Sequence, residues 1–298
     1  MKQIALNITF ATAVLAAFTL ASSAQGLPGW DDPNSAGGGA CKDNAYNCRA
    51  TPNPLPDTGT VWLEEMTWMD VRDAMAGGKT TIIIATGGIE PNGPWLELGK
   101  HNNILHANCE AIARKLGDAL CAPIIKFVPE GEIDPPSGHM MTAGTISLRQ
   151  ETFEALLNDM TESFQVGGFE NVILIGDSGG NQRGMAAVAE KLDGKSGVRV
   201  VHIPQYYDYE SVGQFLRDKG AVPENMESDG LHDDYRVTLN MMADDLKSVR
   251  WQARVNAGLA TINGISIAEK DKTLALAHDL VNFRADSTVA AIKAVLAE

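Results

Sequence analysis

Apolar runs of strand length alternate with helical patterns along this chain, and this alternation constrains the fold more than any other feature. Four runs are continuous and rich in β-branched residues, which is typical of strands buried on both faces: TTIIIATGG, APIIKFVP, NVILIGDS and RVVHIPQY. Helical periodicity lies before, between and after them, and the last segment, 272–298, predicts one or two helices. The alternation predicts an α/β fold with helices on both faces of a mostly parallel central sheet.

Composition divides the chain into three segments. Lys2 precedes an apolar run and then small residues up to position 24, a pattern typical of a secretory signal peptide, with a membrane anchor as the alternative. Residues 25–60 are rich in Gly, Pro, Asn and Asp and predict an irregular N-terminal arm, and 61–298 form the expected domain. No later segment approaches the ~18 apolar residues of a membrane-spanning helix. We expect a periplasmic or secreted protein that has no membrane contact after signal cleavage.

The formal net charge of −14 restricts the partners that the chain can bind. Nucleic acids and anionic lipid surfaces both bind clustered Lys and Arg, so neither is expected as a partner of this acidic chain. A small-molecule substrate is the remaining expectation.

Four cysteines are consistent with an oxidising compartment. Cys41 and Cys48 bracket a short polar loop and predict a disulfide in the N-terminal arm. Cys109 and Cys121 flank a helical segment, so their pairing depends on where that helix ends. Neither pair has the spacing of a zinc finger, and metal binding by cysteine is not expected.

The string GDSGG at 176–180 also surrounds the nucleophilic serine of chymotrypsin-like proteases. Those enzymes are all-β, whereas Ser178 follows a buried-strand pattern and opens a helix, so the protease interpretation is excluded. Ligands of parallel sheets bind where strands end. Four polar loops are candidates for that place: GGIEPNGPWLELGKHNN, SGHMMTAGT, GDSGGN and SDGLHDDY.

These loops, in this order, resemble the creatininase family of metal-dependent amidohydrolases. Five blocks between residues 62 and 290 carry the resemblance: LEEMTWMDVRDAMAGG, IIIATGGIEPNGPWLELGKHN, SGHMMTAGTISL, VGGFENVILIGDSGGN and GLHDDYRVTLNMM. The resemblance implies a creatininase-like α/β/α layered fold, hydrolysis of a C–N bond, two divalent cations and assembly into a homo-oligomer.

The resemblance also implies a set of metal ligands, of which Glu90 is retained. Asn92 stands where the family has His, His101 where it has Asp, and Ser178 where it has the His of H-G-G-N. A neutral imidazole cannot bridge two cations as a carboxylate does, and an amide oxygen is a poor ligand for zinc or manganese. We therefore expect an altered site.

Two versions of that site are open. In one, Glu90, His101 and Asp177 hold a single divalent cation, Zn or Mn, which activates a water. In the other no metal binds, and Ser178 is the nucleophile with His232 and Asp229 of a D-x-x-H string as its catalytic partners. The plainer alternatives are that Ser178 caps the next helix and that His232 is a surface histidine.

Trp95, His139 and Asn181 lie in the same loops and are the expected substrate-binding residues. The expected function is an exported hydrolase that cleaves a C–N bond of a small or cyclic amide. The alternatives are a metal-free serine hydrolase acting on an ester or lactone, and a non-catalytic small-molecule binding protein on the same fold.

Overall fold

The computed structural model describes residues 44–226 and 234–297. The predicted signal peptide, 1–24, lies outside these residues, and the predicted boundary at 60 stays a prediction. No helix in the two described ranges is long and apolar enough to cross a membrane.

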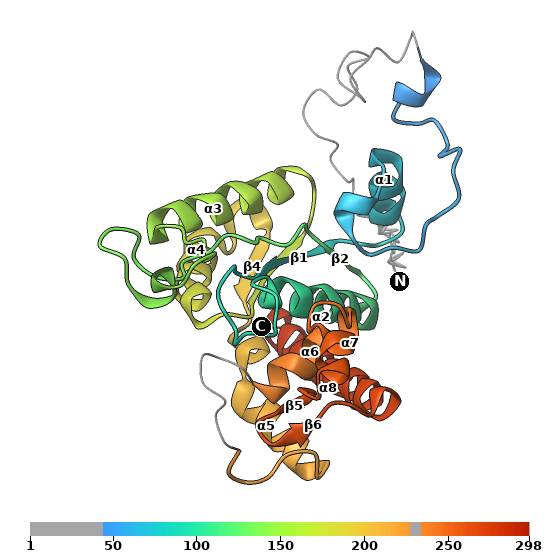
Figure 1. The fold of residues 1–298 in the computed structure, drawn as a ribbon. Helices are drawn as coiled ribbons and strands as arrows, with labels where there is room; N and C mark the ends of the chain where they lie inside the picture. The colour runs from blue at the N-terminus through green and yellow to red at the C-terminus, as the bar shows by residue number, and fades with distance from the viewer. Residues whose placement is uncertain (1–43, 227–233, 298) are drawn as a thin grey trace, which may run out of the picture.

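Four parallel strands form the central sheet in the order β2–β1–β3–β4 (Figure 1). Their bounds are Thr81–Thr86 for β1, Ala119–Cys121 for β2, Asn171–Gly176 for β3 and Arg199–His202 for β4. Ile83 of β1 pairs with Cys121 on one side and with Ile173 on the other. The predicted α/β fold with a mostly parallel sheet is confirmed.

Helices cover both faces of the sheet because successive side chains of a strand point to opposite faces. One face is covered by α2 (Lys100–Leu116) and α8 (Lys270–Leu296), and the other by α3 (Gln150–Val166) and α4 (Gln182–Leu192). Ile83 and Ala85 are buried in the first of these layers, and Ile82 and Ile84 in the second. The expectation of strands buried on both faces is therefore correct for β1.

A third apolar cluster extends the layer of α2 and α8 away from the sheet. It is built from α5 (Tyr209–Asp218), α6 (Tyr235–Asp244), α7 (Trp251–Asn256), β5 (Thr261–Ile262) and β6 (Ile265–Ser266). Leu280 of α8 and Ile104 of α2 are completely buried in this cluster. The cluster fixes α6 and α8 against α2, which carries residues of the site described below.

Part of the structure differs from the sequence-based expectation. The run APIIKFVP, predicted as the second strand, follows β2 and is not a continuous strand: it forms isolated bridges at Ile125 and Val128. Pro123 lacks the backbone N–H that a continuous ladder needs. The helices α5 and α7 were not predicted, whereas α8 agrees with the expectation of one or two terminal helices.

The helix α1 (Trp68–Ala76) precedes β1, as the sequence pattern indicated. Its N-cap Thr67 forms a capping box with Asp70, in which each side chain bonds to the backbone N–H of the other residue. The helix ends at Gly77, one of the two glycines expected there.

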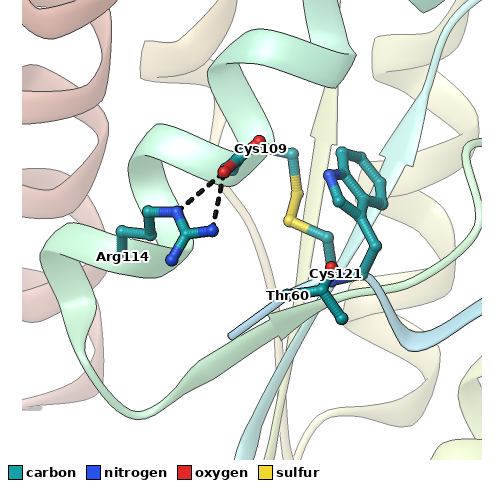
Figure 2. The surroundings of a disulfide bond; sticks show 6 residues. Thr60, Cys109, Arg114 and Cys121 are labelled. Atoms are coloured by element: carbon teal, nitrogen blue, oxygen red, sulfur yellow. Dashed lines mark hydrogen bonds and ion pairs between the residues drawn. A yellow bond between two sulfur atoms is a disulfide. The ribbon is translucent and has the colours of Figure 1, made fainter. Parts of the chain in front are cut away.

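A disulfide joins Cys109 of α2 to Cys121 of β2 (Figure 2). The helix ends at Leu116, and Gly117 takes a left-handed conformation, φ 86°, that reverses the chain toward β2. Both cysteines are completely buried. The open question about this pair is therefore settled, whereas the predicted partner of Cys48, Cys41, lies outside the described residues.

We expect the double variant Cys109→Ala/Cys121→Ala to lower the free energy of unfolding by about 2–4 kcal/mol, because the cross-link between helix and strand is lost. Urea unfolding followed by circular dichroism measures the change. The matched control is Arg114→Ala, whose half-exposed ion pair with Glu110 lies on the same helix. That variant should cost less than about 1 kcal/mol. An unchanged unfolding midpoint for the double variant would contradict the prediction.

Candidate active site

A cavity of about 560 Å³ lies at the carboxyl ends of the parallel strands. Its walls come from the segments that follow β1, β3 and β4 and from the loop that precedes α3. Its titratable and hydroxyl-bearing side chains are Glu90, Lys100, His101, Glu130, His139, Asp177, Ser178, Tyr207, Tyr209, Asp234 and Arg236. The described residues of the loops that were expected to form one pocket therefore do line a common cavity.

Glu90 lies at the centre of the charged groups and is 3% exposed. Its Oε1 atom accepts from Lys100 Nζ at 2.7 Å and lies 3.0 Å from His101 Nε2, and its Oε2 atom lies 3.0 Å from His139 Nε2. Burial opposes the charge of Glu90. The hydrogen bonds with His101 and Glu130 and the charge of Lys100 outweigh burial and hold the pKa of Glu90 well below its usual range.

A chain of buried contacts connects Glu90 to α8. His101 Nδ1 lies 2.8 Å from Asp177 Oδ2, and Arg284 donates to Asp177 Oδ1 at 2.7 Å. Burial raises the pKa of Tyr209 well above its usual value, so the phenol stays protonated and donates to Asp177 at 3.1 Å. Burial also acts against the charge of Asp177, but the charge of Arg284 and the bond with His101 lower its pKa. Both ring nitrogens of His101 are therefore engaged by carboxylates.

Glu130 is the main site residue that the sequence did not reveal. Burial, followed by the hydrogen bond to Glu90 and the charge of Glu90, raises the pKa of Glu130 to about 10. A Cβ atom at Gly88 would overlap Glu130 Oε1, so glycine at position 88 makes room for this carboxyl group. The only signal in the sequence was the run EGEID, which does not distinguish Glu130 from its acidic neighbours.

Glu90, Glu130 and His139 form a group that could hold a metal ion, with one ligand atom from each lying within 4.8 Å of the others. Two carboxylates and an imidazole are donors that zinc and manganese both accept. Glu130 Oε1 is buried and has no hydrogen-bond partner among the described residues. The donor set therefore fits one divalent cation.

The predicted metal ligands divide into two sets. Glu90 belongs to the group with Glu130 and His139, whereas His101 and Asp177 do not. The atoms of His101 and Asp177 that face the site are hydrogen-bonded to one another and to their neighbours. His139, which was expected to bind substrate, is the imidazole of the group.

The remaining predicted residues lie in different places. Ser178 lines the cavity and is 7% exposed, but its hydroxyl does not cap the helical turn that follows. Asn181 is completely buried and its amide donates to the carbonyl oxygens of Thr86 and Gly87, so it connects the loops after β1 and β3. Trp95 does not line the cavity, and its ring lies 5.6 Å from the guanidinium of Arg254.

Asp229 and His232, the expected catalytic partners of Ser178, lie outside the described residues. Their role stays a prediction.

The fold and the position of the cavity are those of layered α/β proteins, which bind small molecules at the carboxyl ends of their parallel strands. The sequence matches the family described as Creatininase, creatinine amidohydrolase, over residues 64–278. The match covers most of the chain, and the protein belongs to the creatininase family. The creatininase-like fold and the resemblance seen in the sequence are thereby confirmed.

Solved structures of that family share the fold. A crystal structure of creatinine amidohydrolase (creatininase) is 18% identical, with a TM-score of 0.55 over 77% of this chain and 97% of that one. A structure described as "Creatininase Mn" is 19% identical, with a TM-score of 0.55 over 76% and 97% of the two chains. A mutant creatininase described as "Zn-Zn type" is 18% identical, with a TM-score of 0.55 over 77% and 97%. A comparison with curated protein sequences finds no match.

We expect Arg284→Met to lower the free energy of unfolding by about 3–5 kcal/mol, because it leaves the fully buried Asp177 without its cation. Urea unfolding at pH 7 measures the loss. Lys219→Met is the matched control, since the ion pair of Lys219 with Asp279 of α8 is about half exposed. It should cost less than about 1 kcal/mol.

The comparison of wild type with Arg284→Met can also be made as a function of pH. The lowered pKa of Asp177 means that its contribution to stability is present above its unfolded value of 3.8 and is lost as the pH falls through the folded value. The difference between wild type and Arg284→Met should therefore shrink on acidification. A difference that grows as the pH falls would contradict this assignment.

Proposed function

We propose that the protein is a hydrolase that cleaves a C–N bond of a small or cyclic amide with the help of one divalent cation, zinc or manganese. The observation that carries the proposal is the convergence of Glu90, Glu130 and His139 at the cavity. Zinc sites of this kind take three protein ligands and leave a position for water or substrate. Membership of the creatininase family supports the hydrolytic class.

The cation, when bound, supplies an activated water and a polarised carbonyl. The protein's own residues hold the carboxylate of Glu90 in place. His101 bonds to the carboxylate of Glu90 at 3.0 Å and is itself held by Asp177 at 2.8 Å. Arg284 anchors Asp177 in turn. Catalytic groups that are held in this way need little reorganisation when substrate binds.

The donors that line the cavity favour a substrate with a carbonyl group. Burial raises the pKa of Tyr207, so its phenol keeps the proton that a hydrogen bond to a carbonyl oxygen requires. The ammonium of Lys100 lies in the same wall. A volume of about 560 Å³ suits a small molecule. Creatinine, the substrate in the description of the family, is the first compound to test.

We also propose that the protein is exported, into the periplasm or the medium, and that it acts there on a free small molecule. The buried Cys109–Cys121 disulfide supports an oxidising compartment. Homo-oligomer formation stays part of the proposal through the family resemblance.

We expect Glu90→Gln and Glu130→Gln each to lower kcat/KM by more than about 100-fold, because each replaces a carboxyl ligand of the cation with an amide that cannot ionise. Ser178→Ala, in the same cavity wall, is the matched control and should retain activity within about 5-fold. The assay measures ring opening of creatinine and of other small lactams and cyclic ureides by the purified protein, before and after treatment with a chelator.

The serine alternative makes the opposite prediction in the same experiment. A fluorophosphonate would then label the wild type but not Ser178→Ala, and activity would survive the chelator. That result would overturn the metal-dependent proposal. Activity that survives all three substitutions would show that the cavity is not the active site.

A further inference from the structure

Lys100 places a positive charge where it competes directly with a metal ion for Glu90. It is the first residue of α2 and is 3% exposed, although it carries an ammonium group. Its Nζ atom lies 2.7 Å from Glu90 Oε1 and donates to Asn92 Oδ1 at 2.5 Å. A buried lysine is rare unless it is paired, and this one has an oxygen partner on each side.

The two oxygens of Glu90 therefore face different surroundings. Oε2 faces His139, on the side of the group that could hold a cation. Oε1 faces the ammonium of Lys100 and the ring of His101. A carboxylate can bind two cations through its two oxygens, one on each side. Here a side-chain cation already occupies one of these two places.

The carbonyl oxygen of Asn92 faces the Lys100 ammonium, and this orientation of the side chain has an energetic cost. The residue is completely buried, and its Nδ2 atom has no hydrogen-bond partner among the described residues. An unpaired buried amide is unfavourable, so the orientation must be stabilised through the carbonyl oxygen. The bond from Lys100 to Asn92 Oδ1 is the interaction that accounts for it.

We propose that the Lys100 ammonium is a built-in cation that occupies a second cation position beside Glu90, formed by Glu90 Oε1 and Asn92 Oδ1. The site consequently takes one divalent ion and not two. The inference rests on the proposed function for the first ion, at Glu90, Glu130 and His139. The "Zn-Zn type" description of a solved creatininase shows that two ions are accommodated elsewhere on this fold.

Metal binding tests the proposal without any measurement of activity. The purified full-length protein is stripped with a chelator, dialysed and titrated with ZnCl₂ in a calorimeter, and bound zinc is then counted by elemental analysis. We expect one equivalent for the wild type and two for Lys100→Met. The second ion should bind at least ~10-fold more tightly to the variant than to the wild type, because a like charge in contact with its ligand is removed.

Two further variants provide a replacement for Lys100→Met and a matched control. Lys100→Gln keeps a donor for Glu90 and removes the charge, so it replaces Lys100→Met if that protein fails to fold. Lys115→Met is the matched control, since Lys115 lies at the other end of α2 and pairs with the exposed Asp286. It should bind zinc as the wild type does.

The outcomes separate this inference from the proposed function. One equivalent in both the wild type and Lys100→Met, with unchanged affinity, would overturn the role of Lys100 and leave the first site standing. No zinc in the wild type but one equivalent in Lys100→Met would support the role of Lys100 and overturn the single-ion site. No zinc in either protein would overturn both.

Discussion

The ion pair between Arg284 and Asp177 joins α8 to the end of β3 with both side chains buried. Arg284 also donates to the carbonyl oxygen of Tyr206 at 3.0 Å, which ties the segment after β4 to the same point. Asp177 then holds His101 of α2. Because one carboxylate receives bonds from three parts of the chain, the segments that follow β1, β3 and β4 are fixed relative to one another. The position of Glu90 depends on that arrangement.

Charge balance explains why such a cluster can be buried at all. An ion that is moved out of water without a partner costs several kcal/mol, so buried charges persist only in pairs with good geometry. Glu90 has Lys100 at 2.7 Å and Asp177 has Arg284 at 2.7 Å, which gives each anion its own cation. The raised pKa of Glu130 fits this balance, because burial and the neighbouring charge of Glu90 both oppose its ionisation. The cavity wall is thus stable as a protein structure before any ligand binds.

Sequence patterns predicted most of the elements but not the contacts between their side chains. The apolar runs at β1 and β3 were found because a strand buried on both faces has a distinctive composition. The run after β2 misled because apolar residues around Pro123 are equally typical of a buried loop. Arg284 could not have been found, since it lies on a long helix whose pattern reports packing alone and contacts Asp177 across 107 positions. Glu130 was hidden for a different reason, because nothing in a loop sequence tells which of several acids points inward.

The departures from the family pattern make physical sense as a set. At position 92, the carbonyl oxygen of the asparagine accepts a hydrogen bond from the Lys100 ammonium. An aspartate at position 101 would add a third carboxylate between Glu90 and Asp177, whereas the imidazole bonds to both. Reversal at position 101 alone would therefore place three buried carboxylates side by side, so the effect of that change depends on the residues around it.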